Sequence, residues 1–600
     1  MDVVSPMQGT IASIAVAEGD EVRGGQALVV VEAMKMEHVI TADAPGIVQR
    51  IAVASGQTVL PGDVLAVLTA VEATANDEEQ HQGDPVESGE RADLAEVVER
   101  HRVGLDEARP DAVERRRSTG QRTARENVSD LIDDGSFVEY GALAIAAQRR
   151  RRDLDDLIRR TPADGLVAGV GKVDGHPTIA MSYDYTVLAG TQGFQNHRKK
   201  DRLFEVAARQ RLPVVFFTEG GGGRPGDVDA PGVASLDCLA FAYFAELSGL
   251  VPLVGITSGY CFAGNAALLG CCDVIIATEG SAIGMGGPAM IEGGGLGVYP
   301  PGEIGPYDDQ VANGVIDIGV PDEAAAVDAA RRYLSYFRGT SDAWSCGDQT
   351  VLRGLIPDNR LRVYDVRSVI DGLADTGSVL ELRRGFAHGM VTALARIEGR
   401  PIGVIANDPT HLAGAIDPDG ADKAARFMQL CDAFDLPILF LCDTPGFMVG
   451  PEVERAAQVR HVSRMFVTAA SLTVPFGTIV LRKGYGLGAQ SMAGGSFHAP
   501  LFCISWPTGE FGGMGLEGAV RLGFRKELAA IEDDDEREQA FAEMVARSYQ
   551  HGKALNVATH FEIDDVIDPA DSRRWISTAF ASAPPPLPRT GKKRPCIDTW

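Results

Sequence analysis

The sequence predicts a multidomain protein in which a small, all-β flattened barrel precedes two α/β domains. Three observations support this prediction: a repeat of short strands near the start, a longer repeat through the rest of the chain, and an acidic, polar segment between them. We expect the barrel at residues 1–70, a flexible linker at 71–95, and α/β domains at 96–345 and 346–600.

The barrel is predicted from the first repeat, which has a constant shift of 37 residues. "IASIAVAEGDEVRGGQALVV" aligns with "VQRIAVASGQTVLPGDVLAV", so that Gly19 meets Gly56 and Gly25 meets Gly62. Each copy consists of Val, Ile and Ala strands separated by Gly-Asp or Gly-Gly turns, which is typical of β-hairpins. Two such halves around a pseudo-twofold axis would form a flattened barrel whose central turn exposes Lys35.

Composition excludes several classes of function. The net charge of −27 argues against a nucleic acid partner, because phosphate backbones are bound by clustered Lys and Arg. No apolar stretch reaches the ~18–20 residues of a membrane helix, and no leader opens the chain. The nine cysteines lack zinc-ligand spacing, so we expect no metal site and a reduced, cytoplasmic protein without a membrane partner.

The second repeat predicts two similar α/β domains. With a shift of 224 residues, "VAGVGKVDGHPTIAMSYDYTVLAG" aligns with "VTALARIEGRPIGVIANDPTHLAG", and Gly190 meets Gly414. The same shift brings Gly264 onto Gly488. Each copy alternates apolar strand runs with amphipathic segments, which is the pattern of a layered α/β unit.

The strongest local signal is a pair of small-residue turns, "SGYCFAGNAALLG" (258–270) and "KGYGLGAQSMAGG" (483–495). A turn that leads into a helix leaves unpaired N–H groups, and two such groups aimed at one carbonyl oxygen would form an oxyanion hole. Alternatively, the glycines serve only a close strand-to-helix crossing.

Residues 1–70 resemble the biotin carboxyl carrier domain, on the signature Ala33-Met34-Lys35-Met36. The resemblance implies that a biotin protein ligase attaches biotin to the Lys35 amine as an amide. Lipoyl domains share the barrel but usually lack the flanking methionines, so biotin is favoured over lipoate. An isolated Met-Lys-Met triplet would otherwise be an ordinary exposed turn.

Residues from about 96 to 580 resemble the carboxyltransferase subunit of biotin-dependent acyl-CoA carboxylases, which has two crotonase-like domains. The matching stretches include "TARENVSDLIDDGSFVE", "DKAARFMQLCDAFDLPILFLCDTPGF", "RKGYGLGA" and "WPTGEFGGMG". The resemblance implies that the amides of Gly264 and Asn265 hold the acyl thioester oxygen. Those of Gly488 and Ala489 would hold the ureido oxygen of biotin.

The resemblance also implies transfer of CO2 from carboxybiotin on the chain's own carrier domain to the α-carbon of an acyl-CoA, with biotin as the base. No Ser-His-Asp arrangement is required, and the sequence offers none. No sequence of the ATP-binding biotin carboxylase type is found, so a separate biotin carboxylase subunit is expected to load the carrier. The family further implies a homo-oligomer built from dimers, as a hexamer.

Two features bear on the substrate. The positions after Gly488-Ala489 are Gln490 and Ser491, where short-chain enzymes usually have an aromatic and then an Asp or aliphatic residue, so a pocket for a medium or long acyl chain is expected. The turn "TEGGGGRPG" also departs from the common family pattern. Alternatives are a short-chain (acetyl or propionyl) carboxylase, a decarboxylase subunit of a sodium pump, and a non-catalytic carrier.

Two basic runs, "RRRRD" (149–153) and Arg115–Arg117, either contact CoA phosphates or form a solvated helical face.

Overall fold

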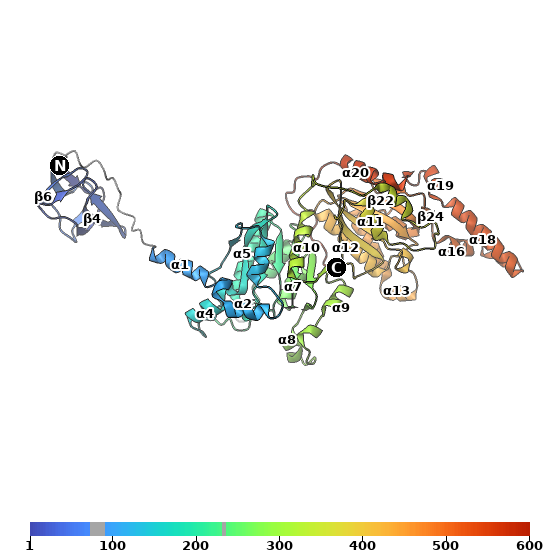
Figure 1. Cartoon of the computed structure of the whole chain (residues 1–600), viewed down its shortest axis with the longest axis horizontal. Helices are drawn as coiled ribbons and strands as arrows, with labels where there is room; N and C mark the ends of the chain where they lie inside the picture. The colour runs from blue at the N-terminus through green and yellow to red at the C-terminus, as the bar shows by residue number, and fades with distance from the viewer. Residues whose placement is uncertain (72–90, 231–235) are drawn as a thin grey trace. The chain divides into compact units, whose positions relative to one another are not determined.

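The computed structural model describes residues 1–71, 91–230 and 236–600, which form two compact units, Met1–Leu94 and Ala95–Trp600 (Figure 1). The predicted linker, 71–95, falls largely on residues outside these ranges, so its flexibility stays a prediction. Helix α1 (Ala92–Arg102) begins inside that range. The predicted boundary at 345/346 also stays a prediction.

The first unit is the predicted all-β barrel. Its strands form two four-stranded sheets, with the orders β1-β8-β6-β3 and β5-β4-β2-β7. Their bounds are β1 Asp2–Val4, β2 Gly9–Ile14, β3 Glu21–Val22, β4 Ala27–Ala33, β5 Met36–Thr41, β6 Gly46–Ile51, β7 Thr58–Val59 and β8 Val64–Ala70. Strand β2 of the first repeat pairs with β7 of the second, and β3 pairs with β6, so each sheet combines both copies.

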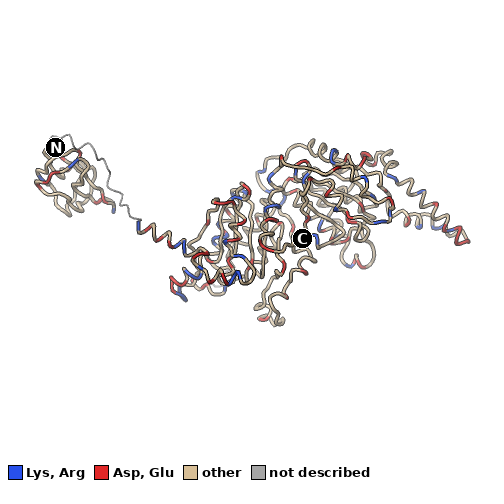
Figure 2. Tube along the Cα trace, viewed as in Figure 1, with Lys and Arg blue, Asp and Glu red and all other residues tan. Residues whose placement is uncertain are grey.

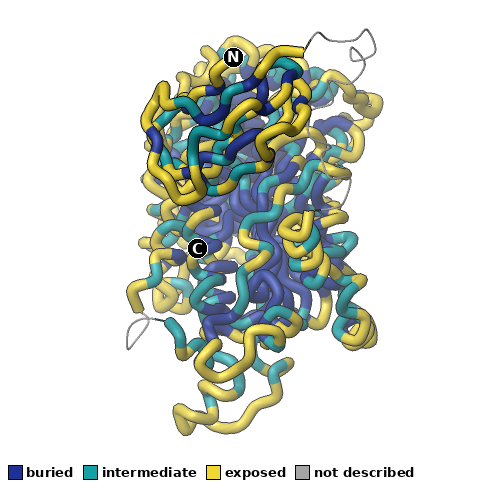
Figure 3. The backbone as a smooth tube through the Cα atoms, turned by 90° about the vertical axis from the view of Figure 1, so that its left-hand side faces the viewer, coloured by how far each residue is buried: buried dark blue, intermediate teal, exposed yellow. Residues whose placement is uncertain are grey.

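The barrel core repeats at the predicted shift. Strands β4 and β8 bury equivalent positions, Leu28 with Leu65 and Val31 with Leu68, while alternate positions face outward. In Figure 3 the strands of the barrel accordingly show buried and exposed segments in turn. The prediction of an N-terminal barrel is confirmed.

The second unit contains two sheets of the same design. The first has the order β17-β15-β13-β12-β11-β10-β9 and the second the order β18-β19-β20-β21-β22-β23-β25. In each, an antiparallel hairpin (β10-β11 or β19-β20) adjoins a run of parallel strands. The first sheet comprises β9 Val138–Glu139, β10 Leu166–Val173, β11 His176–Tyr183, β12 Val214–Phe217, β13 Leu253–Thr257, β15 Val274–Thr278 and β17 Ile318–Val320. The second comprises β18 Leu380–Leu382, β19 Met390–Ile397, β20 Arg400–Asn407, β21 Ile438–Thr444, β22 Phe476–Tyr485, β23 Phe502–Ser505 and β25 Asp565–Val566.

Helices cover both sheets, as expected for crossover connections between parallel strands. Those of the first half are α2 Pro110–Arg117, α3 Ala124–Leu131, α4 Leu154–Arg160, α5 Phe194–Gln210, α6 Ala240–Glu246, α7 Gly264–Gly270, α8 Pro288–Gly293, α9 Tyr307–Ala312 and α10 Glu323–Ser335. Those of the second half are α11 Val366–Leu373, α12 Pro418–Ala433, α13 Pro451–Arg455, α14 Gln458–Ala470, α15 Gly486–Ser491, α16 Leu516–Gly523, α17 Arg525–Ala529, α18 Asp534–His551, α19 Ala554–Thr559 and α20 Ser572–Ser582. Among the described residues, no helix combines the length and apolar character needed to cross a membrane.

The duplication is visible in single hydrogen bonds. The Gln192 N–H donates to the Gly222 carbonyl at 2.7 Å, and 224 residues later the Ile416 N–H donates to the Gly446 carbonyl at 3.1 Å. Buried lysines repeat too: Lys423 Nζ donates to two backbone carbonyls of the preceding turn, as Lys199 Nζ does in the first half. The predicted pair of similar α/β domains is therefore confirmed.

The two halves of the second unit share a core. Phe427 of α12 packs in one apolar cluster with Ile276 and Tyr333 of the first half, and Arg426 Nη2 donates to the Asp273 carbonyl at 2.6 Å. The C-terminal segment adds contacts to both halves, since the Ile597 N–H donates to Ser248 Oγ at 3.0 Å and Arg594 pairs with Asp432 at 2.9 Å.

Candidate active site

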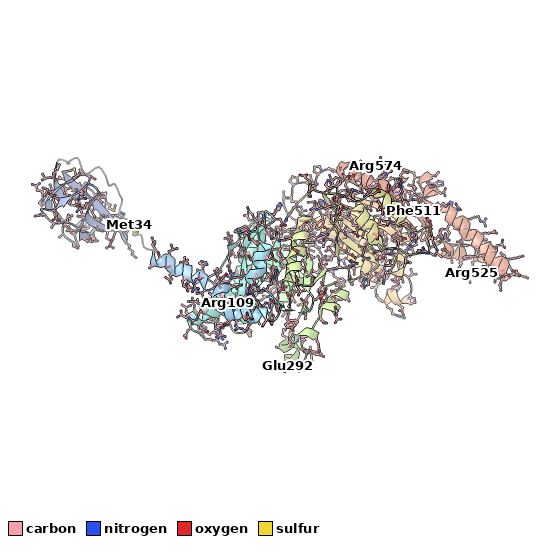
Figure 4. The ribbon with its side chains drawn as sticks, viewed as in Figure 1. Met34, Arg109, Glu292, Phe511, Arg525 and Arg574 are labelled. Carbon is pink, nitrogen blue, oxygen red and sulfur yellow. The ribbon has the colours of Figure 1, made fainter. Side chains whose placement is uncertain are left out.

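Lys35 lies at the tip of a two-residue hairpin turn between β4 and β5. Ala33 and Met36 form the last cross-strand pair, and Met34 and Lys35 between them have φ values of 53° and 66°. This left-handed geometry suits Asn-Gly far better than two long side chains, so the turn is locally strained. Met34 is 98% exposed and is labelled in Figure 4. The lysine is thus presented to solvent, where a modifying enzyme could reach it.

The first small-residue turn opens helix α7. Ala263, which precedes the helix, has φ 52° and ψ −122°, an unusual conformation for a residue with a side chain. Gly264 and Asn265 are the first two helical residues, whose N–H groups have no partner within the helix. Within the described residues, neither N–H donates to another protein atom. The two amides are available for an oxygen acceptor.

The Asn265 side chain is completely buried and ties this turn to its surroundings. Its Nδ2 donates to the carbonyls of Gly190 (3.2 Å) and Thr218 (3.1 Å). Its Oδ1 accepts from the Gly222 N–H (3.1 Å) and from Gln192 Nε2 (3.2 Å). Four bonds to different segments fix the turn. Its counterpart Ala489 has no polar side chain, so sequence reasoning, which used only the backbone of Asn265, missed this role.

A buried lysine extends the network. Lys200 Nζ donates to Gln192 Oε1 at 2.8 Å and to Tyr183 Oη at 3.0 Å. Burial lowers the pKa of Lys200 from 10.5 to about 7.

The second turn opens helix α15. A Cβ atom on Gly488 would lie 2.6 Å from the Gly446 Cα and 3.1 Å from the Phe447 nitrogen, so only glycine fits there. The Gly488 N–H donates to no other group of the described chain, while Ala489 is fully buried behind it. The structure thus places Gly488 and Ala489 as it places Gly264 and Asn265, after a strand and in the first turn of a helix.

Gln490 and Ser491 point in different directions. Gln490 lines a cavity of about 620 Å³ between α15, β24 (Glu510–Gly512) and α19. Ser491 is fully buried, donates to the Gly488 carbonyl at 2.7 Å, and does not line this cavity. The cavity wall also includes Leu487, Phe497, Phe511, Val557, His551 and His560; Phe511 is labelled in Figure 4. It is therefore a mixed, partly apolar space next to the second turn.

Each half buries one carboxylate at an equivalent place, beside its Gly-rich turn. Glu219 pairs with Arg116 at 2.5 Å, and burial raises the pKa of Glu219 to about 7 against the influence of that guanidinium. The equivalent Asp443 pairs with Lys483 at 2.5 Å and with Arg482 at 3.2 Å. The two unusual residues of "TEGGGGRPG" thus have structural partners: Glu219 with Arg116, and Arg224 with the buried Asp164.

The histidines offer no tuned acid or base. Burial and the nearby cations Lys200 and Arg224 lower the pKa of His197 to about 3, so it is neutral at physiological pH. His388 and His411 pack against each other with ring centroids 6.0 Å apart. In the described ranges, no group of three His, Cys, Asp or Glu side chains is arranged to hold a metal ion.

This combination of a lysine-bearing barrel and paired helix-start turns agrees with the family comparisons. The carboxyl transferase domain model matches residues 115–584, and the model of biotin-requiring enzymes matches residues 1–68. The chain belongs to the carboxyl transferase family of biotin-dependent enzymes, with a fused biotinyl domain.

Three similar proteins place the chain further. It is 35% identical over 484 residues to the methylmalonyl-CoA carboxyltransferase 12S subunit of Propionibacterium freudenreichii subsp. shermanii, covering 78% of this chain and 90% of that protein. A solved structure of transcarboxylase 12S, described as a hexamer, is 32% identical with a TM-score of 0.73 and covers 84% and 98%. A single-chain, multi-domain long-chain acyl-CoA carboxylase is 56% identical with a TM-score of 0.79; the match covers 96% of this chain but 56% of that one.

Proposed function

We propose that this chain is the carboxyltransferase component of an acyl-CoA carboxylase and that it carries its own biotin on Lys35. The observation that carries the proposal is the pair of turns 224 residues apart, each presenting free N–H groups at the start of a helix. A non-catalytic carrier would have no use for two such turns.

The two turns would divide the work between donor and acceptor. The amides of Gly264 and Asn265 would hold the thioester oxygen of the acyl-CoA, whose negative charge increases as the α-proton leaves. Those of Gly488 and Ala489 would hold the ureido oxygen of biotin. By analogy with other acyl-transfer sites, each preorganised donor contributes on the order of 3 kcal/mol to lowering the barrier.

Lys35 fits the cofactor because its amine is exposed at the tip of a rigid hairpin. Biotin bound there would supply the carboxyl group and the base for the α-proton. The protein would contribute placement, the exclusion of water and the four amides.

We infer that the acyl chain is medium or long. The similarity to a long-chain acyl-CoA carboxylase supports this inference, as does the position of Gln490 at a cavity with apolar walls. The short-chain alternative predicts a preference for acetyl- or propionyl-CoA instead.

The proposed partners are a separate biotin carboxylase, a biotin protein ligase and further copies of this chain in a dimer-based hexamer. The hexameric assembly of transcarboxylase 12S supports the oligomer. A cytoplasmic location would suit such partners.

The test incubates the biotinylated chain with a biotin carboxylase, ATP, bicarbonate and a panel of acyl-CoAs. ATP-dependent formation of α-carboxylated acyl-CoA would support the proposal. Decarboxylation without net carboxylation would favour the sodium-pump type of subunit, and no reaction in either direction would favour a non-catalytic carrier.

A further inference from the structure

Five arginines surround one cavity of about 330 Å³ in the first half of the second unit. They come from three places in the chain: Arg109 and Arg115 at α2, Arg152 in the loop before α4, and Arg159 and Arg160 at the end of α4. Figure 1 shows α2 and α4 next to each other, and Arg109 is labelled in Figure 4. The two basic runs of the sequence thus meet here.

Each run sends only some of its arginines to the cavity. Arg116 turns inward to Glu219 and Arg117 pairs with Glu126, which leaves Arg115 for the cavity. In the run 149–153, only Arg152 lines it. A merely solvated helical face does not account for this convergence.

Positive charge exceeds negative charge around the cavity. Arg109 pairs with Asp184 at 2.9 Å, while Asp156 lies 3.1 Å from Arg152 and 3.9 Å from Arg160. Asp111 is the one carboxylate among the lining residues. Arg115 and Arg159 have no carboxylate partner in the described part of the chain. Two unneutralised guanidinium groups in a chain of net charge −27 indicate an anionic ligand; Figure 2 shows how widely the acidic residues are spread.

Phosphate is the anion that suits these groups. A guanidinium presents a planar fork that binds two phosphate oxygens at once, and the mutual repulsion of several arginines is relieved by a multiply charged ligand.

The cavity adjoins the turn proposed to hold the thioester. Thr186 and Leu188 line its wall, and Leu188 begins the short turn Leu188–Gly190. The Gly190 carbonyl at the other end of that turn accepts from the Asn265 side chain at 3.2 Å. A ligand with phosphates in the cavity would therefore lie on the same side chain and backbone framework as the first pair of amides.

We propose that this cavity binds the phosphate groups of the coenzyme A moiety of the acyl-CoA, with Arg115 and Arg159 as the principal contacts. Arg109, held by Asp184 and by Thr186 at 2.8 Å, supports the wall of the cavity. The inference rests on the proposed function, because it assumes an acyl-CoA substrate.

The test measures binding of free CoA, 3′-dephospho-CoA and pantetheine to the full-length protein by isothermal titration calorimetry. Arg115→Gln and Arg159→Gln should each weaken CoA binding about tenfold, the effect of losing one charge-assisted contact. Binding of pantetheine, which has no phosphate, should not change. The matched control is Arg149→Gln, which removes the same charge from the same basic region but outside the cavity. Arg159→Lys should restore part of the affinity.

The inference is overturned if the wild type does not bind CoA more tightly than pantetheine, or if the cavity variants weaken CoA no more than Arg149→Gln. Thermal unfolding of each variant shows whether it has folded, and a misfolded Arg115 variant leaves Arg159 to decide. Carboxylation with an unchanged KM for acyl-CoA in both variants would refute the cavity but not the proposed function. CoA binding that follows the expected pattern without any carboxylation would do the reverse.

Discussion

The backbone of Gly488 lies directly against Gly446: a Cβ atom at position 488 would be 2.6 Å from the Gly446 Cα. The first half has a comparable but looser contact, since a Cβ on Gly264 would be 3.1 Å from Gln192 Nε2. Each helix-start turn is therefore pressed onto the neighbouring segments of its own half, and that contact sets the direction of its N–H groups.

Gly488→Ala should lower kcat by about 100-fold or more, because backbone atoms must move and misdirect the amides of this turn. Carboxylation kinetics measure the effect, and mass spectrometry checks that the variant is still biotinylated. Gly270→Ala, whose Cβ would meet no atom within 4 Å, is the control and should retain wild-type rates. A Gly488→Ala enzyme with normal kcat would remove this turn from the mechanism.

Asn265→Ala should lower the free energy of unfolding by about 2–4 kcal/mol, since buried carbonyls and N–H groups lose their partners. It should also reduce kcat, because the turn is no longer fixed to Gly190, Thr218 and Gly222. Urea denaturation and steady-state kinetics measure the two effects. The exposed Asn359→Ala is the comparison, and equal losses in both variants would argue against the special role of Asn265.

Lys200→Met should reduce the pH dependence of stability. The folded chain releases the Lys200 proton near pH 7, whereas the unfolded chain keeps it until about 10.5. Between these values the unfolded state binds more protons, so Lys200 makes the free energy of unfolding rise with pH by up to about 1.4 kcal/mol per pH unit.

Urea denaturation at pH 7 and pH 9 measures this rise. It should be smaller in Lys200→Met than in wild type or in Lys172→Met, which removes an exposed lysine. An identical rise in all three proteins would show that Lys200 stays protonated when buried.

Gln490→Tyr should shift the substrate preference towards shorter acyl chains by filling the cavity next to α15. Each buried CH2 that no longer fits costs up to about 0.8 kcal/mol, or roughly fourfold in kcat/KM. Relative kcat/KM across acyl-CoAs of increasing length measures this shift. Because Ser491 faces the core, Ser491→Asp should destabilise the fold rather than change the preference. A wild-type preference for acetyl-CoA that persists in Gln490→Tyr would refute the medium- or long-chain assignment.

The two sequence repeats predicted most of the fold because equivalent residues keep equivalent bonds. Lys199 and Lys423 each donate to two carbonyls, and Gly190 and Gly414 each adopt a positive φ. The exposed turn at Lys35 was also predictable, since Gly-rich hairpins leave few other geometries.

Other parts of the candidate site depend on tertiary packing that no local pattern records. Adjacent residues of a helix face different directions, so Gln490 and Ser491 could not be separated without the position of α15. The ion pair between Arg116 and Glu219 joins residues 103 positions apart, and Arg115 and Arg159 meet only because α2 and α4 pack together. The buried Asn265 could have been recognised from its polar side chain in an otherwise apolar motif.

The most direct test of the central claim is a single-turnover transfer experiment. The chain is first loaded with labelled carboxyl groups by a biotin carboxylase, ATP and labelled bicarbonate, is then freed of these reagents, and is finally mixed with acyl-CoA. The account predicts that the label leaves the wild-type protein and is recovered on the α-carbon of the acyl-CoA, and that Lys35→Arg, which cannot form the biotinyl amide, is never loaded. Label that remains on the wild-type protein, or loading of Lys35→Arg equal to wild type, would contradict it.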